Sequence, residues 1–237
     1  MSKTIGKAMR EKEPGPIRAL AEKLVENGAD YLDINIGPAR KGGAELMDFV
    51  VRTVQEVAHL PLYLDTMNIE AMEAGLKAHD NRYGKPVINS IMARPERMDA
   101  LIPLARKYES GFVALVYGPE GLPRDANERG ELAAMLQYRA LEAGIPEEDI
   151  WYDPIVVPVT SQQIELQGCT EFMMMLPELA PTSLSTCGLS NVSNGAPEHL
   201  RPVLNQTYLC ILRKYGLKGA ILDGLDKEIL SFARDEK

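Results

Sequence analysis

Short apolar runs alternate with longer amphipathic stretches along almost the whole chain, and this alternation limits the folds that the chain can adopt. Each run is rich in Val, Ile, Leu or Tyr and ends at a turn, which is typical of a buried parallel strand. The predicted strands are ADYLDINIG (29–37), LPLYLDT (60–66), PVINSIM (86–92), GFVALVYG (111–118), DIWYDPIVVPV (149–159), TSLSTCGLSN (182–191) and LKGAILDG (217–224). Strand and helix in regular succession predict βα repeats and therefore an α/β fold.

Helical patterns fill the segments between these strands. They cover residues 16–28, 44–59, 69–81, 95–109, 127–144, 161–179 and 198–216, and a short helix closes the chain. A TIM (β/α)8 barrel needs eight strands, so we predict such a barrel with its first strand missing or truncated. An open doubly wound sheet is the alternative, but no GxGxxG turn follows the first strand. Because no Gly/Ser-rich or Pro-rich linker divides the chain, residues 1–237 are predicted to form a single domain.

Charge and composition exclude several classes of protein. The formal net charge of −8 argues against a general nucleic-acid surface, and no apolar run approaches membrane-spanning length. The three cysteines and three histidines are scattered without a CxxC or HxxxH pair, so no metal site is expected. The cysteine usage and the absence of a signal-peptide core indicate a cytoplasmic protein.

Carboxylate or carboxamide side chains recur where the predicted strands end. They are Asp33, Asn35, Asp65, Asn68, Asn89, Asp153 and Asn191. The carboxyl ends of parallel strands meet at one rim, where α/β folds keep their ligands. We therefore expect a polar binding mouth.

Each of these residues also has an ordinary structural interpretation. Asp65 precedes a predicted helix, but Thr66 or Asn68 can cap that helix, which leaves Asp65 for a ligand. Asn89 is equally compatible with a turn, with Ser90 beside it. Asp153 is followed by Pro154, which favours an extended backbone that caps nothing, so a binding role is the stronger interpretation.

The remaining candidates depend on their neighbours in the sequence. Asn191 lies in the turn-rich CGLSNVSNG, where little side-chain bulk at Gly188 and Ser190 suggests close approach by a ligand. Asp33 and Asn35 alternate with apolar residues, so we expect both to share the face opposite the helices. Carboxylates and carboxamides together match a heterocycle with a 2-amino-4-oxo edge, as in pterins and guanines.

At these residues the chain resembles the methyltetrahydrofolate:corrinoid protein methyltransferases. The matching motifs are LDINIGP, LDTMN, INS, YDPIVVP and GLSNVSNG, in that order and over almost the whole chain. The resemblance implies a TIM barrel, a homodimer and a first strand that this sequence lacks.

The resemblance also implies roles for single residues. Asp65, Asn89 and Asp153 match residues that bind the pterin ring, and Asn191 matches the asparagine near N5, the catalytic position. Asp33 and Asn35 match a polar pair at the mouth, and Ser190 and Arg201 are expected to support the Asn191 loop.

The implied reaction moves a methyl group between N5 of tetrahydrofolate and the cobalt of a corrinoid. No DxHxxG corrinoid-binding motif is present, so cobalamin is expected on a partner, a corrinoid protein. A dihydropteroate synthase-like enzyme and a non-catalytic pterin-binding subunit are the alternatives. The first would need a cluster of Lys and Arg for pyrophosphate, and the sequence contains no convincing one.

Overall fold

A computed structural model describes residues 3–38 and 41–234, and these residues build a parallel sheet of six strands. The order of the strands in the sheet is their order in the sequence. They are β1 (Leu32–Asn35), β2 (Leu62–Asp65), β3 (Val87–Met92), β4 (Gly111–Leu115), β5 (Ile150–Asp153) and β6 (Leu184–Ser185). Within the described residues β1 and β6 are the edges of this sheet, which is not closed.

Helices connect the strands, as the alternation in the sequence predicts. They are α1 (Lys3–Glu11), α2 (Pro14–Glu26), α3 (Gly43–Gln55), α4 (Ile69–Ala78), α5 (Pro95–Lys107), α6 (Ala126–Glu142), α7 (Gln163–Leu179), α8 (Arg201–Lys214) and α9 (Lys227–Ala233). A helix follows each of the first five strands, which is the βα repeat expected of this fold class.

The chain divides into two compact units. Unit 1 consists of Met1–Ser90 and Pro103–Phe112, and unit 2 consists of Ile91–Ile102 and Val113–Lys237. The single-domain arrangement expected from the sequence stays a prediction.

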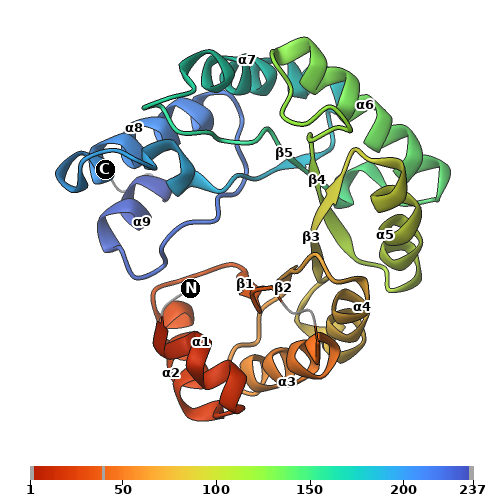
Figure 1. Cartoon of the computed structure of the whole chain (residues 1–237), viewed down its shortest axis with the longest axis vertical. Coiled ribbons are helices and arrows are strands. Elements are labelled where there is room, and N and C mark those ends of the chain that lie inside the picture. Colours follow the sequence, from red (N-terminus) through yellow and green to blue (C-terminus); the bar gives the residue numbers. More distant parts are fainter. Residues whose placement is uncertain (1–2, 39–40, 235–237) are drawn as a thin grey trace. The chain divides into compact units, whose positions relative to one another are not determined.

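The core of unit 1 lies where β2 meets α3 and α4, two helices that pack side by side (Figure 1). Leu64 of β2 and Met47 of α3 are fully buried there. Gly75 of α4 permits the close approach, because a Cβ atom at this position would lie 2.8 Å from Met47 Cγ and 3.1 Å from Leu64 Cδ1. This packing fixes β2 and, with it, the residue that ends the strand, Asp65.

The core of unit 2 lies between the β5–β6 pair and the neighbouring helices α6 and α7, which pack against each other (Figure 1). Tyr152 of β5 and Phe172 of α7 are fully buried, and so is the guanidinium-bearing Arg129 of α6. A buried arginine is unusual, because a charge removed from water needs hydrogen-bond partners.

The structure corrects the sequence prediction at both ends of the strand series. The seventh predicted strand, 217–224, has only an isolated parallel bridge between Gly188 and Ile221, and the sixth is reduced to Leu184–Ser185. The former segment contains Gly219 and Gly224, and glycine weakens a strand because it has no side chain to pack. Residues 3–31 contain two helices and no strand, and α1 was not predicted from the sequence.

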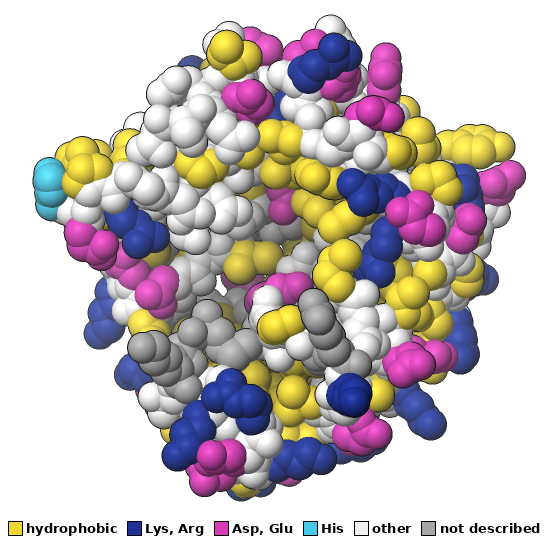
Figure 2. Space-filling view, in the orientation of Figure 1, with side chains coloured by type: hydrophobic (Ala, Val, Ile, Leu, Met, Phe, Trp, Pro, Cys, Tyr) yellow, Lys and Arg dark blue, Asp and Glu magenta, His cyan; other side chains and the backbone are white. Residues whose placement is uncertain are grey.

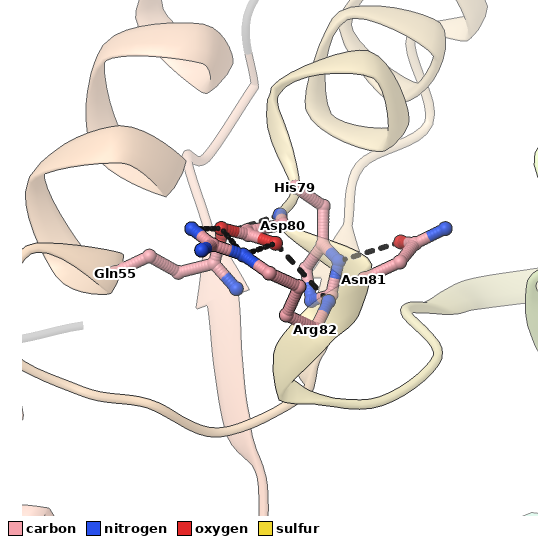
Figure 3. A network of polar contacts seen from close by, with 5 residues as sticks. All are labelled: Gln55, His79, Asp80, Asn81 and Arg82. Carbon is pink, nitrogen blue, oxygen red and sulfur yellow. Dashed lines mark hydrogen bonds and ion pairs between the residues drawn. The ribbon is translucent and has the colours of Figure 1, made fainter.

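A polar network in unit 1 anchors the connection from α4 to β3 (Figure 3). Gln55, the last residue of α3, accepts a hydrogen bond from the Asp80 main-chain N–H at 2.8 Å. Arg82 folds back onto Asp80, and its side-chain hydrogen bonds lower the pKa of the Asp80 carboxyl to about 2. His79 is buried and bonds Asn81 through Nδ1, while its burial lowers the pKa of the imidazole. The network precedes β3 and therefore lies away from the carboxyl ends of the strands.

Candidate functional site

Three polar side chains of unit 1 stand in one row across β1, β2 and β3. The strand register pairs Asn35 with Asp65 and Asp65 with Asn89. Residues paired in a parallel sheet point to the same face, and Asp33, two residues before Asn35, shares that face. The alternation predicted for β1 is confirmed, since Leu32 and Ile34 are buried while Asp33 and Asn35 are exposed. Asn89 lies inside β3 rather than at its end, which corrects one detail of the prediction.

Two crossed hydrogen bonds join these four residues. Asn35 Nδ2 donates to Asp65 Oδ2 at 2.5 Å, and Asn89 Nδ2 donates to Asp33 Oδ1 at 3.1 Å. The Gly37 main-chain N–H donates to Asn35 Oδ1 at 2.8 Å, so both ends of the Asn35 amide are engaged. Within the described part of the chain, Asp65 Oδ1 and Asn89 Oδ1 receive no donor, and they are the acceptors left for a ligand.

The two aspartates of this cluster have raised pKa values. Burial and, second, the negative charge of Asp65 raise the pKa of Asp33, the Asn89 hydrogen bond opposes the rise, and the resulting pKa is about 7. Asp33 nevertheless retains solvent-accessible surface. Burial also raises the pKa of Asp65, and the hydrogen bond from Asn35 opposes it. The cluster can therefore hold a proton near neutral pH, which suits a ligand edge with donors and acceptors.

The helix cap next to Asp65 belongs to another residue. Asn68 precedes α4, and its side chain accepts a hydrogen bond from the Ala71 N–H at 2.9 Å. Thr66 Oγ1 accepts from the Asn68 N–H at 3.2 Å. Asn68 and Thr66 thus accept the hydrogen bonds of main-chain N–H groups at this turn, and Asp65 does not cap the helix, as the sequence predicts.

In unit 2, Asp153 ends β5 and faces a tight turn. Its Oδ1 accepts a hydrogen bond from the Ile155 main-chain N–H at 2.8 Å. Burial raises the pKa of Asp153 to about 6, although the Ile155 hydrogen bond lowers it. Ile155 adopts a positive φ of 64°, a conformation that costs a β-branched residue energy and so marks a constrained turn.

Asn191 lies in the 310 helix η3 (Leu189–Ser193), not at a strand end as predicted, because β6 stops at Ser185. Its side chain is exposed, and its Oδ1 accepts a hydrogen bond from Asn194 Nδ2 at 3.3 Å. A Cβ atom at Gly188 would lie 3.2 Å from Asn191 Nδ2. The small residue at 188 therefore makes room for the Asn191 amide itself.

The predicted supporting residues of this loop form a short chain of contacts. Arg201 Nε donates to Ser193 Oγ at 3.4 Å, and the Ser193 hydroxyl donates to the Ser190 carbonyl at 3.1 Å. The Ser190 side chain is exposed. The loop is also tied to the segment after β5, since the Val159 N–H donates to the Val192 carbonyl at 3.0 Å. Arg201 thus supports η3 through Ser193 rather than through Asn191.

One residue close to Asp153 in unit 2 was missed by sequence reasoning. Arg129 of α6 donates through Nε to the Pro154 carbonyl at 2.9 Å, immediately beyond Asp153. The helical pattern around NERGEL contains several charges, so nothing in the sequence separates this buried arginine from solvated ones.

Away from the strand ends, the features to consider in the described residues are metal clusters, membrane-spanning helices, grooves and charged surfaces. Residues 3–38 and 41–234 contain no cluster of three His, Cys, Asp or Glu that could hold a metal ion. None of their helices combines the length and apolar character needed to cross a lipid bilayer. A groove among the outer helices of unit 1 includes two ion pairs, Arg18 with Glu56 and Arg52 with Asp48. Acidic and basic side chains are interspersed on the face shown in Figure 2, which fits a modest net charge of −8.

The βα repeats and this row of carboxylate and carboxamide side chains match the class of pterin-binding α/β enzymes. The chain belongs to the pterin binding enzyme family, whose model matches residues 2–223.

Two curated relatives extend this finding. The chain is 28% identical over 236 residues to a methylcorrinoid:tetrahydrofolate methyltransferase of Eubacterium limosum. The alignment covers 98% of this chain and 85% of the relative. It is 26% identical over 231 residues to the methionine synthase of Mycobacterium leprae, covering 93% of this chain but only 19% of that longer protein.

Solved structures of dihydropteroate synthases share the fold. The enzyme of Xanthomonas albilineans in complex with 7,8-dihydropteroate superposes with a TM-score of 0.67 at 20% identity, covering 93% of this chain and 85% of that one. The Yersinia pestis enzyme gives a TM-score of 0.69 at 15% identity, covering 92% and 88%. The predicted TIM-barrel fold class is thereby confirmed. At these identities the likeness concerns the fold alone.

Proposed function

We propose that this protein is a tetrahydrofolate-dependent methyltransferase that moves a methyl group between N5 of tetrahydrofolate and the cobalt of a corrinoid carried by a partner protein. The row Asn35–Asp65–Asn89 is the observation that carries the proposal, because it presents a carboxylate and a carboxamide side by side on one face of neighbouring strands. Membership of the pterin binding family and the relative that covers 98% of the chain support it.

Pterin recognition follows from the hydrogen-bonding groups of the row. The 2-amino-4-oxo edge of a pterin offers an exocyclic amine and a ring N–H as neighbouring donors. Asp65 has one oxygen held by Asn35 and the other open, and a carboxylate accepts such donors with charge-assisted hydrogen bonds. Asn89 has its nitrogen engaged by Asp33, so its oxygen is the open acceptor. We assign Asp65 and Asn89 to the pterin ring, with Asp33 and Asn35 orienting them.

In unit 2 we assign two residues, on the family match and on their own contacts. Asp153 binds the pterin through its second oxygen, since the first accepts from Ile155. Asn191 serves N5, where the departing methyl leaves electron density. Its oxygen accepts from Asn194, so the amide nitrogen is the group that donates to N5 or to a water beside it. An amide is not an acid, and its contribution is to stabilise developing charge in the transition state.

The cobalt is a substrate centre in this proposal and arrives on a corrinoid protein. Reduced corrinoid cobalt is a strong nucleophile, so the task of this chain is to hold the folate and to improve its N5 as a leaving group. The homodimer and the cytoplasmic location expected from the resemblance and the cysteine usage stay predictions. Light scattering of the purified protein tests the first.

The test combines binding with turnover. Isothermal titration of the purified protein with 5-methyltetrahydrofolate is expected to show binding, and a spectroscopic assay with methylcobalamin and tetrahydrofolate is expected to show methyl transfer. Absence of folate binding sinks the proposal. Binding without transfer, in the presence of an active corrinoid protein, identifies a non-catalytic pterin-binding subunit.

The same experiment separates the dihydropteroate synthase alternative. Incubation with a pterin pyrophosphate and p-aminobenzoate is expected to give no condensation product. Formation of dihydropteroate at a rate above that of methyl transfer would replace the proposed function by that alternative.

A further inference from the structure

Arg129 is fully buried in unit 2, and its side-chain hydrogen bonds within the described residues go to main-chain carbonyl groups. Nε donates to Pro154 at 2.9 Å, Nη1 to Asp125 at 3.0 Å and Nη2 to Glu165 at 2.9 Å. No ion pair joins it to a carboxylate within the described residues. The guanidinium therefore connects the turn after β5, the start of α6 and the first turn of α7.

This arrangement is costly, so it needs a reason. Removing a charge from water costs several kcal/mol unless its donors are satisfied. Burial accordingly lowers the pKa of Arg129. The surrounding structure is built to accept the group, because a Cβ atom at Gly168 would lie 2.9 Å from Arg129 Nη1. An apolar side chain of similar volume would fill the space between α6 and α7 without the free-energy cost of desolvating a charge.

The Nε contact explains what the arginine adds. The carbonyl of Pro154 and the N–H of Ile155 belong to one planar peptide group and point in opposite directions. Arg129 binds the carbonyl side of this group, and Asp153 Oδ1 accepts from the N–H side at 2.8 Å. The positive φ of Ile155, 64°, requires that something hold the peptide in this orientation.

We propose that Arg129 is a positioning residue, which fixes the Asp153 carboxylate through the peptide group between Pro154 and Ile155. One oxygen of Asp153 is thereby fixed, and the other is presented in a set direction to the ligand. Hydrogen bonds in such a chain polarise one another, so the donor at Ile155 is strengthened by the charge behind it. The inference rests on the proposed function only in assigning Asp153 to a folate ligand.

The first test measures the turn itself and needs no ligand. Amide hydrogen exchange is followed at Ile155 in the wild-type protein, in Arg129→Lys and in Arg129→Met. Lysine keeps the charge but lacks the planar fork that reaches three carbonyls. Exchange at Ile155 is expected to rise at least about tenfold in both variants. The reference amides are Thr186, bonded to the Tyr152 carbonyl, and Ala180, bonded to Leu176, and both are expected to change little.

The second test measures the consequence for binding. A double-mutant cycle combines Arg129→Lys with Asp153→Asn, and the dissociation constant of 5-methyltetrahydrofolate is the readout. If Arg129 acts through Asp153, each single variant weakens binding and the double variant is no weaker than Asp153→Asn alone. Gly168→Ala displaces the guanidinium without removing it, so it provides a second variant should the arginine variants fold poorly.

The outcomes separate this inference from the proposed function. Unchanged exchange at Ile155, or an equal rise at Ile155, Thr186 and Ala180, would mean that Arg129 only stabilises the packing of unit 2. Either result overturns the inference. Additive losses in the cycle overturn it as well. If the wild-type protein binds no folate, the proposed function fails, while the exchange experiment still decides whether Arg129 holds Asp153.

Discussion

Asn35 donates its side-chain amide to Asp65 Oδ2 at 2.5 Å, across the β1–β2 pair in which the two residues are register partners. The bond holds one carboxylate oxygen, and no donor among the described residues holds the other. Since the Gly37 N–H fixes the opposite end of the Asn35 amide, the orientation of Asp65 is set by protein groups before any ligand binds. Such preorganisation reduces the entropy that binding must overcome.

Asp65→Asn is expected to weaken binding of 5-methyltetrahydrofolate by about 10- to 100-fold, because a hydrogen bond to a charged acceptor contributes about 1.5–3 kcal/mol. The change keeps the size of the side chain and removes its charge. Isothermal titration measures the effect. Asp48→Asn is the matched control, since Asp48 lies exposed on α3 in an ion pair with Arg52. Equal affinities of the two variants would remove Asp65 from the binding site.

Asn191→Ala is expected to lower the rate of methyl transfer by about 100-fold while changing folate affinity less than about fivefold, because its donor acts on charge that develops in the transition state. Single-turnover spectroscopy of the corrinoid measures the rate. Asn194→Ala, which removes the partner of the Asn191 oxygen, is expected to give a smaller loss. Parallel losses in affinity and rate would make Asn191 a simple binding residue.

The Asp33 pKa of about 7 predicts a pH-dependent contribution to stability. Its pKa in the unfolded chain is near 3.8, so the folded state binds the proton more tightly. The stabilisation is complete below about pH 4 and is lost as the pH rises through about 7. Asp33→Asn removes this dependence and retains the acceptor oxygen that Asn89 uses.

Urea unfolding of both proteins between pH 4 and 8 measures this effect. As the pH rises, the free energy of unfolding of the wild type is expected to fall relative to that of Asp33→Asn. The raised pKa values of Asp65 and Asp153 and the lowered pKa of His79 occur in both proteins, so they largely cancel in the difference. A difference that stays constant with pH would contradict the assignment.

Gln55→Leu is expected to lower the free energy of unfolding by about 1 kcal/mol without changing folate affinity. The Asp80 N–H loses its acceptor, but the variant also removes Gln55 Nε2, a buried donor with no partner among the described residues. Thermal unfolding and titration measure the two quantities. The control is Gln167→Leu, which alters only an exposed bond to Glu171 on α7. A change in folate affinity for Gln55→Leu would show that the segment between α4 and β3 affects ligand binding.

The sequence predicts the parts of this fold whose pattern is local. The alternation of Leu32 and Ile34 with Asp33 and Asn35 follows from the period of a strand, and Asn68 follows from the chemistry of a helix cap. Both need only neighbouring residues for their recognition.

What the sequence does not reveal depends on contacts between distant segments. Asn191 is predicted at a strand end, but β6 stops at Ser185 and the 310 helix η3 carries the residue. Arg129 has the sequence surroundings of a solvated helix residue, and only the carbonyls of Pro154 and Glu165 reveal its place. Such pairings appear only when the chain is folded.

Because Asn35, Asp65 and Asn89 share one register, the backbone of unit 1 sets the distance between the side chains that face a ligand. Neighbouring strands lie about 4.8 Å apart, so the three side chains are spaced by the sheet and span about 10 Å. Substituting one of them changes which atom is recognised but leaves the spacing as it is. Ligand length is therefore encoded in the strand pairing and ligand chemistry in the side chains, so the two can diverge independently among related proteins.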